Sequence, residues 1–312
     1  MTSITVVIPV YNRPQQLEAA LASVLAQQPT PDEVIIVDDA SPQGLPKLPE
    51  HPAVRLVRRE HNGGVAAAQN TGLHAASSEL ICFLHSDDAM LPGKLDRESA
   101  MLETAAPGVG AVESGSLRVL ADHTVELGPR LEGASAEALL RREVTNVHIS
   151  PFMFRREALL AIGGFDERLR AYEDFDLLLR FRQRFDIVTI AEPSVQLTQH
   201  GEDRLAKSPW MQHGRELLLD KYREELRRFK RLPPGWQQWE MLAALDAFHR
   251  GERRRGRRHI LRSVRGDHQA LVRRAPLVVG SFLPDHLCRS LAERYRVRSG
   301  ERTRRRARRS SS

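Results

Sequence analysis

The sequence predicts an α/β fold in which a mixed, mostly parallel β-sheet is covered by helices on both faces. Short β-branched runs such as residues 4–8 and 34–37 have the uninterrupted apolar character of strands buried on both faces of a parallel sheet. Segments with apolar residues at helical spacing separate these runs, and the alternation continues for about 200 residues. The 312-residue chain is long enough for this domain and a smaller appendage.

The first half of the domain shows the clearest strand–helix alternation. Pro9 is expected to end the first strand, and apolar residues at helical spacing within 14–27 predict the first helix. A second strand at 34–37 then completes a β-α-β unit. The expected elements that follow are strand 54–57, helix 65–76, strand 80–84 and helix 92–104.

The second half of the domain is less regular. Residues 109–127 contain several glycines and only short strand candidates, so we expect the edge of the sheet and adjoining loops there. The remaining expected elements are strand 150–154, helix 156–161, helix 173–184 with one apolar face, and a last strand at 187–190.

Charge divides the chain into two parts. Residues 1–200 hold 18 Lys and Arg against 27 Asp and Glu, whereas residues 201–312 hold 29 against 13. In the second part we expect basic amphipathic helices at 210–230 and 236–250, and the end of the chain is too charged to fold alone. The expected organisation is a domain at 1–200, a helical basic extension at 201–298 and a disordered basic tail at 299–312.

Cysteine content and hydropathy indicate a cytoplasmic protein. Cys82 and Cys288 are too few for a disulfide framework and lack the clustered spacing of a zinc site. The first residues lead straight into a strand without the features of a signal peptide. The longest later apolar stretch, 275–283, is much shorter than the ~20 residues that span a bilayer. We therefore expect a protein that is not itself transmembrane.

Polar residues follow three of the expected strands directly. Tyr11 comes after the first strand, Asp38 and Asp39 after the second, and Asp87 and Asp88 after strand 80–84. In open α/β sheets ligands bind outside the carboxyl ends of the strands, so together these residues predict a nucleotide pocket. Any one aspartate alone is more simply explained as a helix cap or turn residue.

The adjacent carboxylates of Asp87 and Asp88 indicate metal chemistry. Two such groups repel each other unless a divalent cation lies between them and a diphosphate, which predicts Mg²⁺ or Mn²⁺. The alternative is a solvated pair near the N-terminus of the next helix, where acidic residues are favourable.

Six segments resemble, in order and spacing, family 2 glycosyltransferases. They are VIPVYN (7–12), VDDAS (37–41), NGGVAAAQN (62–70), FLHSDD (83–88), GGFDE (163–167) and EDFD (173–176). The resemblance covers about residues 3–200, and its specificity lies in the ordered set. It implies a GT-A fold and an inverting, metal-dependent enzyme that transfers a sugar from a nucleotide-diphosphate donor, with a UDP-sugar favoured.

The resemblance also implies roles for individual residues. Those expected around the nucleoside, ribose and diphosphate are Pro9, Tyr11, Asn12, Asp38, Asn62, Gly64, Asn70 and Asp87. Asp88 is the expected direct metal ligand, and His200 stands where relatives place a histidine that helps to bind the metal or diphosphate; a surface histidine in a polar loop is the alternative. Asp174 is the expected base that deprotonates the acceptor hydroxyl.

Two positions depart from the family pattern. His85 stands where the first Asp of an Asp-x-Asp motif is common, and Gln69 stands where an Arg commonly precedes the Asn. His85 is compatible with metal or phosphate binding, but a simple hydrogen-bonding group is the more ordinary role. The missing arginine removes an expected phosphate or base contact. Donor choice and metal affinity are therefore expected to differ from the family norm.

The basic runs at 253–258 and 304–309 leave several partners open. A solvated surface is the simplest interpretation, followed by docking at an anionic membrane that holds lipid-linked acceptors, which would place the protein at the inner face of the membrane. Nucleic acid is the least favoured partner, because the aromatic residues typical of single-strand binding are absent. The expected function is transfer to a glycan or lipid-linked acceptor in cell-surface polysaccharide or glycoconjugate synthesis. The alternative is a non-catalytic nucleotide-sugar-binding or membrane-docking module.

Overall fold

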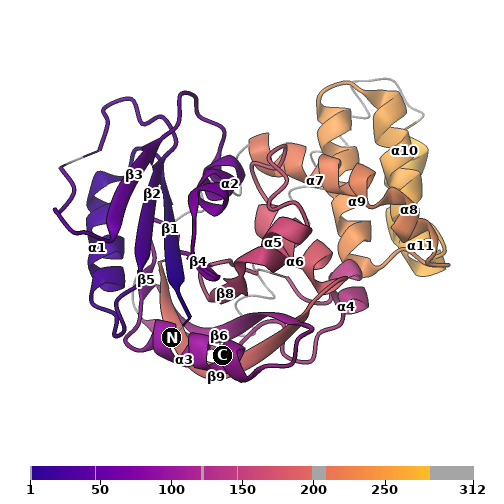
Figure 1. Cartoon of the computed structure of the whole chain (residues 1–312). Coiled ribbons are helices and arrows are strands. Elements are labelled where there is room, and N and C mark those ends of the chain that lie inside the picture. The colour runs from indigo at the N-terminus through magenta and orange to yellow at the C-terminus, as the bar shows by residue number, and fades with distance from the viewer. Residues whose placement is uncertain (1, 46, 121–122, 146, 199–208, 282–312) are drawn as a thin grey trace. The chain divides into compact units, whose positions relative to one another are not determined.

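The chain forms two compact units, which we describe separately (Figure 1). A computed structural model describes residues 2–45, 47–120, 123–145, 147–198 and 209–281. The first unit comprises Met1–Leu140 and Val144–Met211, and the second comprises Arg141–Glu143 and Gln212–Ser312. The predicted domain boundary at residue 200 and the predicted tail at 299–312 lie outside the described residues.

The first unit is built on a mixed, mostly parallel sheet, as the sequence predicts. Its strands are β1 (Ile4–Val10), β2 (Glu33–Asp38), β3 (Val54–Arg58), β4 (Leu80–Phe83), β5 (Ala89–Met90), β6 (Val109–Val119), β7 (Thr124–Leu127), β8 (Phe152–Arg155) and β9 (Asp186–Thr198). The order is β3-β2-β1-β4-β8-β6-β9-β5, with β7 paired to β6. β8, β7 and β5 run antiparallel to their neighbours.

Helices cover both faces of this sheet (Figure 1). They are α1 (Pro14–Leu25), α2 (Val65–Ala75), α3 (Lys94–Thr104), α4 (Ala136–Leu140), α5 (Arg156–Ala161) and α6 (Glu173–Arg182). One face of β1, including Ile8, shares a core with Leu17 of α1 and Leu95 of α3. On the other face of the sheet, α2 packs against β1, and Phe154 of β8 packs against Phe181 of α6 with ring centroids 5.2 Å apart.

α2 lies unusually close to the centre of the sheet. A Cβ atom added at Gly72 would lie 2.3 Å from Cγ1 of Val7, so only glycine allows this approach. Val7 is fully buried, and its strand pairs with β2 and β4 on either side. The backbone at Val7 therefore has little freedom to move away.

Gly72→Ala is expected to lower the free energy of unfolding by about 1–3 kcal/mol, because overpacking a rigid core outweighs the better helix propensity of alanine. Urea denaturation followed by circular dichroism measures this change. Gly128→Ala is the matched control, since a Cβ there meets no atom within 4 Å. Equal stability of the two variants would contradict the close packing of α2.

Three sequence predictions about this unit are wrong in extent. β1 continues through Pro9 to Val10, because its pairing with β4 ends at Val7 and a ladder donor is no longer needed there. β6 is not edge and loop but an 11-residue strand inside the sheet, between β8 and β9. β9 extends over 13 residues, well beyond the expected 187–190.

The second unit is helical. Its helices are α7 (Pro209–Lys221), α8 (Arg223–Arg227), α9 (Pro234–His249), α10 (Arg253–Ser263) and α11 (His268–Gly280). The expected helix 210–230 is divided into two at Tyr222. The expected basic amphipathic helix 236–250 is instead the mostly buried α9, which contains no Lys or Arg. Trp236 and Phe248 on α9 are almost completely buried.

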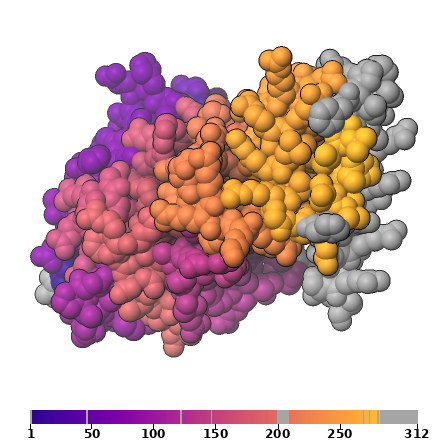
Figure 2. Space-filling model, turned by 90° about the vertical axis from the view of Figure 1, so that its right-hand side faces the viewer, coloured from indigo at the N-terminus to yellow at the C-terminus, as the bar shows by residue number. Residues whose placement is uncertain are grey.

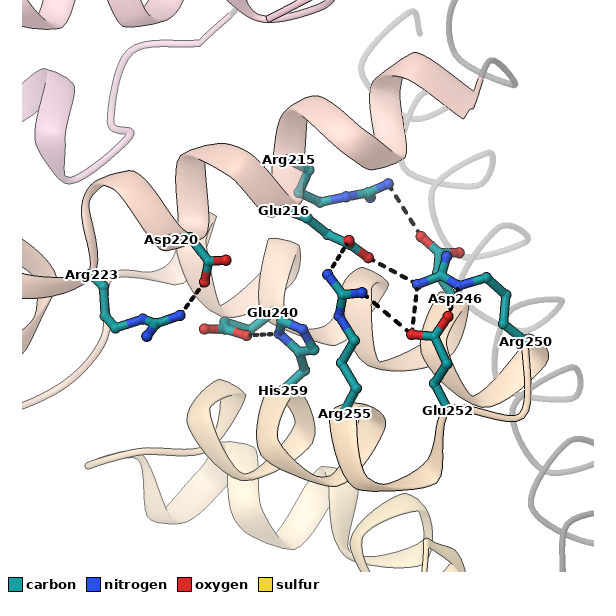
Figure 3. A network of polar contacts seen from close by, with 10 residues as sticks. All are labelled: Arg215, Glu216, Asp220, Arg223, Glu240, Asp246, Arg250, Glu252, Arg255 and His259. Carbon is teal, nitrogen blue, oxygen red and sulfur yellow. Dashed lines mark hydrogen bonds and ion pairs between the residues drawn. The ribbon is translucent and has the colours of Figure 1, made fainter. Parts of the chain in front are cut away.

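Ion pairs connect the helices of the second unit around α9 (Figure 3). Glu216 of α7 accepts from Arg250 at 3.1 Å and from Arg255 of α10 at 2.5 Å. His259 of α10 lies 2.5 Å from the buried carboxylate of Glu240 on α9. Part of the positive charge of this unit is thus neutralised within the fold. Among the described helices, none combines the length and the apolar character that crossing a membrane requires.

Candidate active site

The candidate site is formed by the loops that follow the parallel strands of the first unit. Of the four non-glycine residues with positive φ in the described chain, Asn12 (54°) follows β1, Ala40 (61°) follows β2 and Tyr172 (67°) precedes α6. Such backbone conformations are uncommon for these residues and concentrate where a fold positions functional groups. Gly64, with φ of 86°, begins α2 at the same edge.

Asp38, at the end of β2, is buried and only partly satisfied. Its Oδ1 accepts from the Ser41 backbone N–H at 2.9 Å. Its buried Oδ2 has no hydrogen-bond partner and lies 3.4 Å from Nη1 of Arg58. Ser41 Oγ accepts in turn from the Asn12 backbone N–H at 2.9 Å, which ties the β1 and β2 loops together. Asp38 is therefore fixed in place, and its Oδ2 accepts no hydrogen bond from the described residues.

Asp39 supports the turn into α2. Its carboxylate accepts from the backbone N–H groups of Gly63 at 3.0 Å and Gly64 at 2.8 Å. The Asn62 side chain donates to the Asp39 carbonyl at 3.2 Å and accepts from Arg170 Nη1 at 2.9 Å. Two predicted binding residues, Asn62 and Gly64, are thus held by Asp39, the residue that follows Asp38.

His85, Asp87 and Asp88 form a cluster after β4 that has the composition of a metal site. One ligand atom from each lies within 4.8 Å of the others. Asp88 Oδ2 accepts from Ser150 Oγ at 2.7 Å, and its Oδ1 accepts from the Thr198 N–H at 3.2 Å. Each carboxylate oxygen retains a second lone pair for a cation. Asp87 pairs with Arg13, so its charge is partly balanced.

The electrostatics of this cluster suit a bound cation. Burial raises the pKa of Asp88 to about 6, because the low-dielectric surroundings disfavour the charged form. Burial lowers the pKa of His85, but nearby carboxylates, led by Asp174 and Asp88, outweigh it and the net shift is upward. The buried Nε2 of His85 has no hydrogen-bond partner. A cation would relieve the repulsion among these carboxylates and use that nitrogen.

Asp174, the predicted base, lies in the first turn of α6 and is buried. Its Oδ2 accepts from the Ile149 N–H at 3.0 Å, while its Oδ1 has no partner. Burial raises the pKa of Asp174, although His85 and the Ile149 N–H act in the opposite direction. Burial and then Asp174 also raise the pKa of Glu173. A raised pKa makes this carboxylate a stronger base than an exposed one, and its Oδ1 accepts no hydrogen bond from the described residues, as suits a proton acceptor.

Residues 148–151 join the two acidic groups to a neighbouring cavity. Ile149 binds Asp174 and Ser150 binds Asp88, so consecutive residues hold both carboxylates. His148 and Pro151, on either side, line a cavity whose other lining residues are Glu113, Ser114, Ser116, Arg118, Leu127, Gly128, Arg130 and Leu197. Burial, then His85 and the two arginines, lower the pKa of His148 to about 4, so it is neutral there.

The structure brings most of the predicted residues to one edge of the sheet. Tyr11 is exposed beside Asn12, and Pro9 is buried in β1. Asn70 instead clamps the loop before α6: it accepts from the Phe165 N–H at 2.8 Å and donates to Glu167 at 2.9 Å. Gln69 is fully buried with both amide atoms unpartnered. His200 lies outside the described residues.

Three residues of the site are absent from the sequence predictions. Ser150 anchors Asp88, Arg13 pairs with Asp87, and Arg170 makes two hydrogen bonds to Asn62, each 2.9 Å long. Arg170 thereby places a guanidinium at the loop that precedes α2. The position of Arg170 just before the acidic pair at 173–174 is the one sequence signal that could have indicated its role.

Comparison with models of protein families assigns the chain to a family. The model described as "Glycosyl transferase family 2" matches residues 5–163, half of the sequence. The chain belongs to this family. A second model, "Glycosyltransferase like family 2", matches residues 135–214. The family predicted from the six motif segments is confirmed.

Relatives in this family include proteins of polysaccharide synthesis. An uncharacterized glycosyltransferase of Haemophilus influenzae is 27% identical over 205 residues, which cover 63% of this chain and 68% of that protein. The succinoglycan biosynthesis protein ExoO of Rhizobium meliloti is 31% identical over 189 residues, covering 56% and 54%. The matched part is thus about half the length of ExoO.

A solved structure confirms the fold. The S. aureus TarS 1-349 structure in complex with UDP-GlcNAc has a TM-score of 0.61 at 14% identity, with 94% of this chain and 91% of that chain covered. At this identity the likeness concerns the GT-A fold alone, which the sequence predicts.

Proposed function

We propose that the protein is an inverting, metal-dependent glycosyltransferase that moves a sugar from a nucleotide-diphosphate donor to a hydroxyl acceptor. The observation that supports this most strongly is the cluster of His85, Asp87 and Asp88 at the carboxyl end of β4, beside the buried Asp174. Metal-dependent sugar transfer needs ligands for a cation and a separate carboxylate that accepts the acceptor proton, and this site offers both.

The residues present fit Mg²⁺ or Mn²⁺. The cluster offers carboxylate oxygens, the hard donors that both ions prefer, and the unpartnered Nε2 of His85, a borderline donor that suits Mn²⁺ better than Mg²⁺. Asp88 is the principal ligand of the proposal, with Asp87 and His85 beside it and His200 as a further candidate. When bound, the cation would neutralise the charge of the donor diphosphate. Ser150 and the Thr198 N–H hold Asp88 in position for it.

Asp174 is the proposed general base. Its free Oδ1 takes the proton of the acceptor hydroxyl, whose oxygen then bonds to the anomeric carbon as the bond to the nucleoside diphosphate breaks. Attack from the face opposite the leaving group inverts the configuration. The hydrogen bond from Ile149 fixes the other oxygen of Asp174 and so directs Oδ1.

The donor is proposed to bind along the ends of β1 and β2. Tyr11, Asn12 and Asp38 would contact the nucleoside, and Asn62 with Gly64 would lie near the ribose and diphosphate. A UDP-sugar is favoured, because a structural neighbour of the same fold, TarS, was solved with UDP-GlcNAc. Asn70 acts in this proposal by holding the 165–167 loop, since its amide is already engaged there.

The acceptor is proposed to approach along residues 148–151, because Ile149 and Ser150 in this segment hold Asp174 and Asp88. A glycan or lipid-linked acceptor is the proposed class, as two relatives are named for succinoglycan biosynthesis. We propose that the protein acts in the cytoplasm, at the inner face of the membrane. Cys82 is a buried free thiol, which agrees with a reducing compartment.

A melting-temperature screen of nucleotide sugars tests the donor site. A ligand that binds only the folded protein stabilises it by about 2.7 kcal/mol at a hundred times its Kd. UDP-sugars with Mn²⁺ are expected to raise the melting temperature, and the rise should be largely lost with a chelator or in Asp88→Asn. No nucleotide sugar raising the melting temperature, with or without Mn²⁺, would contradict the proposal.

A non-catalytic nucleotide-sugar-binding module is the second candidate. His85 in place of the usual aspartate favours it, because the cluster then carries one carboxylate fewer. Calorimetric binding and turnover assays separate the two functions. Donor binding without hydrolysis or transfer across a panel of acceptors would favour the module, and any metal-stimulated turnover would favour the enzyme.

A further inference from the structure

The outward face of α11 is apolar. Leu271 is 41% exposed, Val272 61% and Val279 65%, and their spacing places them along one side of the helix. The opposite side packs into the second unit through Ala270 and Leu277, which are almost fully buried. α11 therefore buries one apolar face and presents another to its surroundings, which is unusual for a helix at a protein–water boundary.

α10, which contacts α11, presents arginines together with one more aliphatic residue. Arg254 and Arg258 are exposed, and the 51% exposed Leu261 lies on the same stripe of the helix. Arg254 and Arg258 make no hydrogen bond or ion pair with the described part of the chain. By contrast, Arg255 pairs with Glu216 inside the network of Figure 3.

The exposed charge of these helices has one sign. Residues 253–281 contain nine arginines and a single acidic residue, Asp267. Asp267 is buried, caps α11 by accepting from the Ala270 N–H at 2.9 Å, and pairs with Arg231. Nothing acidic in this segment therefore offsets the exposed arginines.

Aliphatic exposure is concentrated on the same two helices. Of the eight large hydrophobic residues that are exposed in the described chain, four belong to α10 and α11. In Figure 2 the yellow atoms of these helices form part of the visible surface of the second unit. We define the α10–α11 surface as Arg254, Arg258, Leu261, Leu271, Val272 and Val279.

We propose that the α10–α11 surface docks the protein on an anionic lipid bilayer. Aliphatic side chains can enter the boundary between headgroups and acyl chains, while guanidinium groups bind lipid phosphates. Each basic residue near an anionic membrane strengthens the attraction. The proposal does not depend on transferase activity, although a lipid-linked acceptor would be found at such a surface.

Other occupants match the surface less well. Nucleic acid would bind the arginines but would leave the exposed Leu and Val side chains in water. The two helices also contain no Phe, Tyr or Trp on which a base could stack. A second copy of the chain would bring like charges together, because its own α10 carries the same arginines. Only an anionic bilayer complements both the charge and the aliphatic side chains.

Vesicle co-sedimentation of the full-length protein tests the proposal. The wild type is expected to sediment with vesicles of phosphatidylglycerol and phosphatidylcholine, but not with phosphatidylcholine alone. Val272→Glu combined with Val279→Glu, and separately Arg254→Glu combined with Arg258→Glu, are each expected to lower the partition coefficient by about tenfold or more. Wild-type melting temperatures would show that the variants remain folded.

Leu56→Glu combined with Met101→Glu is the matched control for the valine pair, since both residues are exposed and apolar, lie in the first unit, and the charge change of −2 equals that of the two valine substitutions. It should change the partition coefficient by less than about twofold, as expected for surface changes away from the α10–α11 surface. Absence of sedimentation with anionic vesicles, or equal loss in the control, would overturn the proposal. Salt-sensitive duplex DNA binding without vesicle binding would favour nucleic acid instead. A dimer that the Val272→Glu and Val279→Glu changes dissociate, again without vesicle binding, would favour a second copy.

Discussion

Asp174→Asn is expected to slow sugar transfer strongly while leaving donor binding nearly unchanged. The amide cannot accept the acceptor proton, yet it keeps the size of the carboxylate and can still accept the hydrogen bond from the Ile149 N–H. General base catalysis contributes about 10²–10⁴-fold, so kcat should fall by that factor. Steady-state turnover measures kcat, and calorimetric titration measures the Kd of the donor.

Two further variants make this result specific. Asp88→Ala should lose turnover and also weaken donor binding in the presence of Mn²⁺, because its side chain is the proposed metal ligand. Asp186→Asn is the control: its exposed carboxylate pairs with Arg182 away from the acidic cluster, and its turnover should match the wild type. Normal turnover by both Asp88→Ala and Asp174→Asn would reject the assignment of the site.

Glu98→Ala is expected to lower the free energy of unfolding by about 3–5 kcal/mol. Lys94 and Glu98 are one turn apart on α3, fully buried, and joined at 2.7 Å. Glu98 also accepts from Ser114 Oγ of β6 at 2.6 Å. Removing the carboxylate leaves an ammonium group buried without a counter-charge, which costs more than the pair itself contributes. Urea denaturation measures the loss.

Two companion variants show whether the loss of stability comes from an unpaired buried charge or from lost packing. Lys94→Met combined with Glu98→Leu removes both charges at similar volume and is expected to recover most of the stability. Glu50→Ala disrupts the exposed i,i+3 pair with Lys47 and should leave the unfolding midpoint unchanged. A double variant as unstable as Glu98→Ala would contradict this explanation.

The parallel half of the fold could be predicted because its strands are uninterrupted apolar runs. β6 could not, because its residues do not resemble a buried strand. Glu113 is satisfied by the backbone N–H groups of Arg130 and Leu131, each at 2.7 Å. Gly115 lies where a Cβ would be 2.4 Å from the Ala191 carbonyl. Tertiary contacts far along the chain therefore override the local pattern.

The candidate site shows the same division. Asp38 and Asp88 follow their strands directly, so their convergence could be predicted from the rule for open sheets. Ser150 and Arg170 reach the site from segments without a distinctive local pattern, and only the folded chain brings them near. Asn70 was predicted near the donor from the resemblance, whereas its amide is engaged with the 165–167 loop. A direct donor contact of Asn70 stays a prediction.

Anomalous diffraction from crystals soaked with UDP and MnCl₂ tests the site most directly. The proposal predicts one manganese peak within about 2.3 Å of an Asp88 oxygen, bridged to the UDP diphosphate, with the uridine beside Tyr11 and Asp38. UDP bound elsewhere, or a manganese ion distant from Asp88 while UDP occupies the ends of β1 and β2, would contradict it.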